Sequence, residues 1–309
     1  MEPTNGRKKI PAEAVELYSQ FIHGEISRRD FANGVKRFAV AGLTATAIID
    51  ALMPNYALGQ QVRKDDERIR ASYETVPSPN GHGYIRGYFV RPDSANSRDE
   101  NPAKLPGVIV VHENRGLNPH TEDVARRFAL ANFMAFAPDA LTSVGGYPGD
   151  DYKGGLLFGK LDGAKRTQDF IAAARWLKAR PDCTGQIAAT GFCFGGGMAN
   201  TLSVMLGGEL AAAAPFYGGA PKPEDVPKIK GAILIHHGGL DKALSGAYPA
   251  QEAELKKNNV RYEGHIYPNS VHGFFNDATP ERYNEAAARQ AWTRTIECFN
   301  QYARETAQG

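Results

Sequence analysis

From about residue 70 to the end, the sequence alternates between short apolar runs and longer segments of helical periodicity. The short runs are bounded by Gly, Pro, Asn or Asp, which is typical of strands. The segments between them repeat apolar residues at the spacing of an amphipathic helix. Alternating strands and helices form a mostly parallel sheet with helices on both faces, and the active residues of such sheets lie at the carboxyl ends of the strands. The sequence therefore predicts one α/β domain over residues 70–309.

The individual elements follow from the same patterns. We expect strands at 83–92, 106–113, 133–140, 186–193, 211–218, 231–238 and 262–268. We expect helices at 120–132, 163–180, 195–206, 249–259 and 280–304. The glycine-rich stretch 143–163 lacks clear periodicity, so we expect it to form a loop over the site.

One strand-to-helix junction carries a cysteine. In "GFCFGG", Cys193 lies between Gly191 and Gly195. A turn of the form G-x-nucleophile-x-G is a nucleophile elbow, in which glycines leave room for a strained backbone that lifts the side chain clear of the sheet. Cys193 is therefore the candidate nucleophile. The other two cysteines, Cys183 and Cys298, are too unevenly spaced to form a disulfide framework or a zinc ribbon with it.

A cysteine nucleophile needs a base and a group that orients the base. In this architecture they follow the nucleophile in the order acid, then histidine. Asp241 follows the apolar run 231–238, and His272 follows the run 262–268. His272 would hold Cys193 near the thiolate and later activate water, while Asp241 would select the histidine tautomer. Taken singly, either residue could instead serve only to form a turn or a helix cap.

These motifs together carry a family resemblance. From about residue 80 to the end, the chain resembles the dienelactone hydrolase family of the α/β-hydrolase fold, in "GFCFGG", "GLD" at 239–241, "HGF" at 272–274 and "VIVVHENRGLNPH". The resemblance implies that Glu113 meets the resting thiol and helps to deprotonate it when substrate arrives. It also implies an oxyanion hole made by the backbone N–H groups of Asn114 and Phe194.

The sequence departs from the family where the substrate would be held. Dienelactone hydrolases bind the substrate carboxylate with arginines, one of them shortly after the catalytic histidine, but Asn276 stands at that position here. Arg115, close to the expected oxyanion hole, is a candidate substitute. An exposed loop arginine of this kind could also simply be solvated.

Composition and thiol chemistry narrow the substrate. The net charge of +2 comes from nearly balanced acids and bases without a long basic run, so nothing indicates a nucleic-acid partner. A thiolate leaves a tetrahedral intermediate more easily than an amine does, which favours activated esters and lactones over amides. No metal or other cofactor is expected, because His112 and His120 lack the H-E-x-x-H spacing of a zinc protease. The adjacent pair His236 and His237 would point to opposite faces of a strand.

Two further functions remain open from the sequence. Within enzymes, the chain could be a thioesterase or an acyltransferase. Outside enzymes, the scaffold could be a binding or redox-sensing module whose Cys193 is oxidised rather than acylated. The combination of Glu113, Asp241 and His272 favours catalysis, since a sensor needs no complete triad with an oxyanion hole.

The first 62 residues differ in character from the rest. Val15, Tyr18 and Ile22 recur at helical spacing. The pair Arg28 and Arg29 precedes an apolar stretch, 38–53, and an Ala-Leu-Gly triplet at 57–59, which resembles a twin-arginine export signal. That reading predicts a periplasmic protein that begins near Gln60.

The alternative interpretation of the same segment is an ordinary helical extension. Ser27 and Asp30 match a capping box that opens a helix. The apolar stretch is short and rich in Ala, Gly and Thr, so no permanent membrane span is expected. In this reading the segment stays attached in a cytoplasmic protein and packs on the catalytic domain or on a second subunit, as a homo-oligomer.

Overall fold

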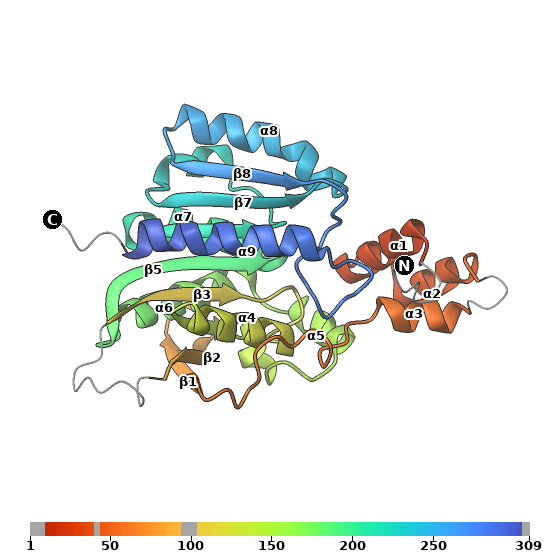
Figure 1. The fold of residues 1–309 in the computed structure, drawn as a ribbon, viewed down its shortest axis with the longest axis horizontal. Helices are drawn as coiled ribbons and strands as arrows, with labels where there is room; N and C mark the ends of the chain where they lie inside the picture. Colours follow the sequence, from red (N-terminus) through yellow and green to blue (C-terminus); the bar gives the residue numbers. More distant parts are fainter. Residues whose placement is uncertain (1–9, 40–43, 94–103, 305–309) are drawn as a thin grey trace, which may run out of the picture.

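The structure is a computed structural model and describes residues 10–39, 44–93 and 104–304. Its centre is an eight-stranded sheet in the order β1-β2-β4-β3-β5-β6-β7-β8 (Figure 1). Strand β2 pairs antiparallel with both β1 and β4, and all the other neighbours are parallel. The strands are β1 Ile69–Ser78, β2 Gly83–Pro92, β3 Leu105–Val111, β4 Met134–Pro138, β5 Cys183–Phe192, β6 Ala212–Phe216, β7 Ala232–Gly238 and β8 Tyr262–Tyr267.

Helices cover both faces of this sheet. The helices of the α/β domain are α4 Pro119–Leu130, α5 Asp151–Phe158, α6 Gly163–Ala179, α7 Phe194–Leu206, α8 Lys242–Lys257 and α9 Glu285–Phe299. Helices α4 and α9 pack in the core cluster on one face of the sheet. Helices α6, α7 and α8 pack in the cluster on the other face. The α/β class and the two-faced arrangement predicted from the sequence are therefore confirmed.

The local predictions were wrong in four places, one of which is the start of α9, at Glu285 instead of residue 280. Strand β1 was missed, because most of its residues are exposed and its sequence lacks an apolar run. The stretch expected to be a loop contains a short 3₁₀ helix, Ala140–Val144, and helix α5. Helix α8 begins at Lys242, whereas the predicted start is residue 249. The prediction is wrong because proline usually marks the first turn of a helix, but Pro249 lies inside this one.

Three N-terminal helices form a separate layer beyond the carboxyl ends of the parallel strands (Figure 1). They are α1 Ala12–His23, α2 Arg28–Lys36 and α3 Ala45–Leu52, and their apolar residues make a third core cluster. Ser27 caps α2 by accepting from the backbone N–H of Asp30 at 3.1 Å, as the capping-box interpretation expects. Part of the predicted apolar stretch, 40–43, lies outside the described residues. Within the described ranges, no helix is both long enough and apolar enough to span a bilayer.

Candidate active site

The backbone at Cys193 has the conformation expected of an elbow. Strand β5 ends at Phe192 and helix α7 begins at Phe194, so Cys193 stands alone between them with φ 55° and ψ −113°. A positive φ is strained for any residue with a Cβ atom. A Cβ on Gly195 would lie 2.2 Å from the carbonyl oxygen of Val111, so only glycine allows α7 to approach β3 this closely. The turn thus lifts the thiol to the edge of the sheet and leaves it half-buried.

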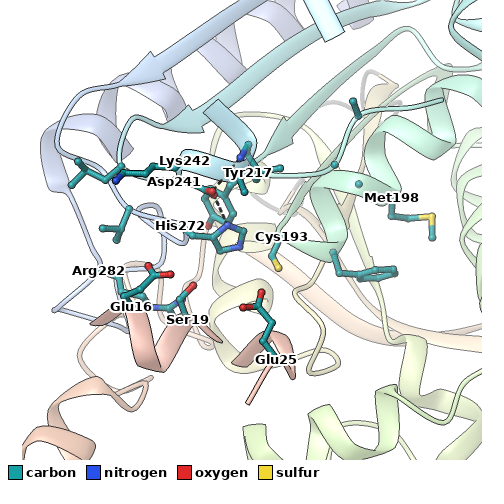
Figure 2. A pocket seen from close by; sticks show the side chains of 18 of the residues that line it. Glu16, Ser19, Glu25, Cys193, Met198, Tyr217, Asp241, Lys242, His272 and Arg282 are labelled. Carbon is teal, nitrogen blue, oxygen red and sulfur yellow. Dashed lines mark hydrogen bonds and ion pairs between the residues drawn. The ribbon is translucent and has the colours of Figure 1, made fainter. Parts of the chain in front are cut away.

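His272 and Asp241 meet Cys193 at this edge. Asp241 follows β7 and caps α8, and its Oδ2 lies 2.7 Å from Nδ1 of His272, which follows β8 (Figure 2). His272 also hydrogen-bonds the side chain of Cys193. The structure therefore brings together three side chains that are far apart in the sequence, in the geometry of nucleophile, base and orienting acid.

Burial and charge act in opposite directions on the histidine. Burial by itself lowers the pKa of His272, but the neighbouring Cys193 and Asp241 outweigh it and raise that pKa to about 10. Burial likewise raises the pKa of Asp241, but its hydrogen bond and attraction to His272 lower that pKa overall. The two shifts thus favour a charged imidazolium next to the Asp241 carboxylate.

Glu113 is buried. It follows β3, and Nδ2 of Asn276 donates to its Oε1 at 3.4 Å. Burial alone would raise the pKa of Glu113, but the charges of Arg282, His120, Arg115 and His272 together lower it. Asn276, at the position where the family has an arginine, therefore contacts the glutamate rather than leaving it unpaired.

The expected oxyanion-hole groups lie on two adjacent segments. Phe194 is the first residue of α7, where main-chain N–H groups have no partner within the helix. Asn114 follows Glu113 in the loop after β3. The close approach of Gly195 to Val111 puts this loop next to the start of α7.

The triad faces a cavity of about 1120 Å³. One wall comes from α7 and the loops after the strands, with Phe194 and Met198. The opposite wall comes from helix α1, with Val15, Glu16 and Ser19. Figure 2 shows Glu16 and Ser19 close to His272. The N-terminal segment therefore contributes directly to the site.

The sequence analysis missed several residues that line the cavity, among them Tyr217 and Arg282. Tyr217 follows β6 with φ 37°, and its ring centroid lies 4.9 Å from that of His272. The strand-end rule that found Asp241 missed it, because the predicted strand 211–218 includes Tyr217, whereas β6 ends at Phe216. Arg282 carries no such signal, because it lies in an irregular segment after His272.

Arg282 is a buried cation beside the nucleophile. The residue is only 5% exposed, and its guanidinium lies 5.2 Å from the ring centroid of Tyr18. Its Nε and Nη1 have no hydrogen-bond partner among the described residues. Both atoms are buried, and a Cβ on Gly273 would lie 2.6 Å from Nη1. Arg282 therefore places a positive charge at the wall of the cavity.

Arg115 lies elsewhere. Its Nη2 donates to the carbonyl of Ile22 at 3.0 Å, and its Nη1 to the carbonyl of Asp151 at 3.4 Å. Its guanidinium is thus engaged by main-chain oxygens and is not among the groups that line the cavity. We therefore place Arg282, and not Arg115, in the candidate substrate site.

No group of three or more His, Cys, Asp or Glu residues is arranged to hold a metal within the part of the chain that the structure describes. His112 instead accepts from the backbone N–H of Ala140 at 3.1 Å. His120 lies 3.0 Å from Asp277.

Comparisons of this chain with a family model and with individual proteins all indicate the same family. Residues 85–303 match the model of the dienelactone hydrolase family. A protein of Escherichia coli strain K12 named "Putative carboxymethylenebutenolidase" is 29% identical over 257 residues, 78% of this chain and 90% of that protein. A protein of the same name from Saccharolobus solfataricus is 32% identical over 248 residues, 68% of this chain and 91% of that protein.

A solved structure agrees with these relatives. The crystal structure titled as a "Putative Dienelactone Hydrolase" from Klebsiella pneumoniae superposes with a TM-score of 0.66 at 27% identity. The match covers 76% of this chain and 99% of that one. Helices α1–α3 lie before the first residue of the family model.

Proposed function

Because the chain belongs to the dienelactone hydrolase family, we propose that it hydrolyses a small ester or lactone through a thioester on Cys193. The observation that carries this proposal is the chain of contacts from Cys193 to His272 to Asp241 at one wall of the cavity. A strained cysteine held against a histidine that a carboxylate orients is the arrangement that nucleophilic catalysis requires. The same mechanism needs no metal.

The reaction proceeds in two halves. The thiolate of Cys193 attacks the carbonyl carbon, and the backbone N–H groups of Asn114 and Phe194 stabilise the resulting oxyanion. The intermediate collapses, the bond to the leaving oxygen breaks, and His272 gives that oxygen a proton. Water then gives a proton to His272 and attacks the thioester, and breakage of the S–C bond releases the acid and restores the thiolate.

Glu113 is proposed to accept the thiol proton when substrate arrives, as the family resemblance implies. The support is its burial next to Arg282, which keeps a carboxylate ionised inside the protein. An ionised carboxylate close to a thiol can act as its base.

The substrate is proposed to carry an acidic group. Arg282 supplies a positive charge at the wall of the cavity, although the family's arginine is replaced by Asn276. The cavity volume of about 1120 Å³ exceeds what a small bare lactone would fill. An activated ester or lactone with a carboxylate and a further substituent fits both features.

The decisive experiment compares cysteine variants on a chromogenic ester. We expect Cys193→Ala to abolish hydrolysis while the fold remains intact, because the thiol supplies the attacking atom. The matched controls are Cys183→Ala and Cys298→Ala, which we expect to retain activity. Cys193→Ser should also lose most activity, since a hydroxyl has a far higher pKa than a thiol. Turnover at the wild-type rate in Cys193→Ala would refute the assignment.

The same assay separates the other functions. Mass spectrometry of the acid-quenched reaction should detect the acyl group on the peptide that contains Cys193. Addition of alternative alcohol or thiol acceptors would reveal an acyltransferase, because ester or thioester products would then replace the free acid. A protein that forms no acyl adduct but whose Cys193 is oxidised by dilute peroxide would instead be a redox module.

A further inference from the structure

The carboxyl end of helix α1 contacts the loop that we propose to form the oxyanion hole. The carbonyl of Ile22 accepts from Nδ2 of Asn114 and from Nη2 of Arg115, each at 3.0 Å. Carbonyls in the last turn of a helix have no partner within it and carry the negative end of the helix dipole. The residue whose main-chain N–H is assigned to the oxyanion hole is thus held through its own side chain by the N-terminal segment.

Aromatic contacts fasten the same helix to the catalytic domain. Tyr18 is 1% exposed and covers the guanidinium of Arg282. Phe21 stacks on Tyr152 of α5, with ring centroids 5.9 Å apart. Arg28, one of the two arginines of the export-like motif, lies 5.0 Å from the centroid of that Tyr152 ring. The contacts bury one face of α1 against the active site.

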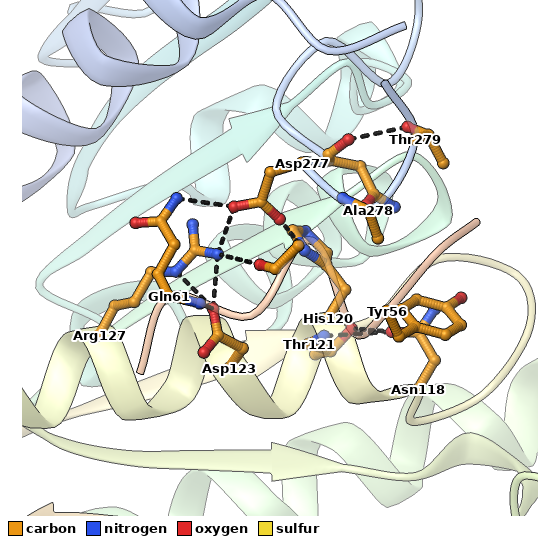
Figure 3. Close-up of polar contacts among 12 residues, drawn as sticks. Tyr56, Gln61, Asn118, His120, Thr121, Asp123, Arg127, Asp277, Ala278 and Thr279 are labelled. Atoms are coloured by element: carbon orange, nitrogen blue, oxygen red, sulfur yellow. Dashed lines mark hydrogen bonds and ion pairs between the residues drawn. The ribbon is translucent and has the colours of Figure 1, made fainter. Parts of the chain in front are cut away.

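The linker that follows these helices, residues 54–62, is hydrogen-bonded to the loop that carries His272 (Figure 3). The backbone N–H of Asn55 donates to the carbonyl of Ala278 at 2.6 Å, and Nε2 of Gln61 donates to Oδ2 of Asp277 at 2.7 Å. A Cβ on Gly59 would lie 2.5 Å from the backbone nitrogen of Ala278, so this approach requires glycine.

A second set of contacts ties the linker to α4 and α5. The hydroxyl of Tyr56 donates to Oδ2 of Asp151 at 2.7 Å and accepts from Nδ2 of Asn118 at 2.9 Å. The backbone N–H of Val62 donates to Oδ1 of Asp123 at 2.8 Å. The linker is therefore part of the catalytic domain's surface rather than a free tether.

We infer that the described N-terminal helices, hereafter the cap (residues 10–39 and 44–53), are a working part of the active site. Helix α1 forms one wall of the cavity and positions the loop of Asn114, and Tyr18 positions Arg282. This inference rests on the proposed function. It follows that the active enzyme retains its N-terminal segment, since removal up to Gln60 would open the cavity and release the oxyanion loop.

The test loosens the cap in the full-length protein without changing a residue of the triad. Phe21→Ala and Tyr152→Ala each remove one side of the same stacking contact. Tyr84→Ala is the control, because it also removes an aromatic side chain but Tyr84 lies on β2, outside the cap, and is half-exposed. We expect kcat/KM for a chromogenic ester to fall about tenfold to a hundredfold in the first two variants, since small displacements of catalytic groups are costly. The control should stay within about twofold of wild type, a difference of less than 0.5 kcal/mol.

A second readout does not depend on turnover. The rate at which a bulky maleimide labels Cys193, followed by peptide mass spectrometry, reports how open the cavity is. We expect this rate to rise about tenfold, or 1.4 kcal/mol, in Phe21→Ala and Tyr152→Ala, while small iodoacetamide gains less. The effect of the double variant should be smaller than the sum of the two single effects, because the two substitutions share the contact between Phe21 and Tyr152.

The outcomes separate the two proposals. Unchanged kcat/KM and unchanged maleimide labelling in Phe21→Ala and Tyr152→Ala would overturn the role of the cap. Full activity of Cys193→Ala would instead refute the proposed function. Maleimide labelling of Cys193 in Phe21→Ala and Tyr152→Ala would still report whether the cap covers the thiol. Sequencing of the amino terminus of active protein from its own cells adds a further check, and an active form that begins near Gln60 would contradict the inference.

Discussion

His272 links the chemistry of the site to the pH dependence of stability. Its pKa of about 10 in the folded protein lies above its ordinary value of 6.5. A group whose pKa is raised by folding stabilises the protein fully below its unfolded pKa, and this contribution is lost as the pH rises through its folded pKa. The contribution of His272 is thus complete below about pH 6.5 and vanishes between there and about pH 10.

The corresponding prediction concerns His272→Gln. We expect the free energy of unfolding of the wild type to exceed that of the variant at pH 6, and the difference to shrink steadily toward pH 10. Urea denaturation at several pH values measures it. Two curves that run parallel across this range would show that folding does not raise the pKa of His272.

Glu113 gives a kinetic prediction. If it accepts the thiol proton, Glu113→Gln should slow the acylation burst by about a hundredfold, while deacylation changes little because His272 still activates water. Stopped-flow measurement of the burst with a chromogenic ester distinguishes the two steps. Asn276→Ala, which keeps the Glu113 carboxylate but removes its hydrogen bond and the bond from the backbone N–H of Ala278 to Oδ1 of Asn276, serves as the control and should have a much smaller effect on the burst. A normal burst in Glu113→Gln would exclude the role as a proton acceptor.

Arg282 gives a prediction about selectivity. Arg282→Lys keeps the positive charge but loses the planar pair of N–H donors that suits a carboxylate. We expect kcat/KM to fall about tenfold or more for an ester that bears a carboxylate, and to change little for a neutral ester of the same size. An equal loss of kcat/KM on both esters would mean that Arg282 stabilises the fold or the charge of Glu113 and does not bind the carboxylate of the substrate.

The residues of the site differ in how far the sequence could predict them. The positions of Asp241 and His272 follow from one rule, that side chains after neighbouring parallel strands meet at the same edge. The contact between Tyr18 and Arg282 follows from no such rule, since it joins a helix outside the sheet to an irregular loop. Arg115 shows that proximity in the sequence can mislead. It lies next to site residues in the sequence, but its guanidinium is held by the main-chain carbonyls of Ile22 and Asp151.

At the scale of elements, the position of α7 depends on the absence of a side chain at Gly195. A Cβ there would collide with the carbonyl of Val111 on β3. We expect Gly195→Ala to destabilise the protein by about 1–3 kcal/mol, as overpacked sites do, and to lower kcat, because α7 carries the N–H of Phe194. Urea denaturation and steady-state kinetics measure both effects. Gly208→Ala is the control, since nothing lies within 4 Å of a Cβ at that position.

The elements that the sequence predicted well are those with strong apolar patterns. Strands β3 to β8 combine apolar runs with clear breaks, because most of them are buried on both faces of the sheet. Strand β1 lies at the edge and is largely exposed, so its sequence carries no comparable signal. Helix α5 has too few apolar residues on one face to be recognised, and its position depends on contacts with Arg115 and the cap.

At the scale of the whole molecule, the chain combines a family domain with a cap that the family model does not include. Composition alone could indicate a helical segment before residue 62, but not where it docks. Its docking surface is made of loops that follow β3 and β8, which come together only in the folded sheet. The sequence therefore left export signal and packed extension as alternatives, because both use the same apolar and basic residues.

The contact between Tyr18 and Arg282 also sets an order of events during synthesis. The ribosome releases Tyr18 early, whereas its partner emerges close to the end of the chain. The face of the cap that docks on the catalytic domain therefore stays exposed until Arg282 has been synthesised. Incomplete chains thus carry exposed apolar surface that chaperones can bind. We expect ribosome-bound chains arrested before Arg282 to be cleaved by protease near Tyr18, and released full-length chains to resist it. Equal resistance to protease in the arrested and the released chains would show that the cap helices pack against another part of the growing chain.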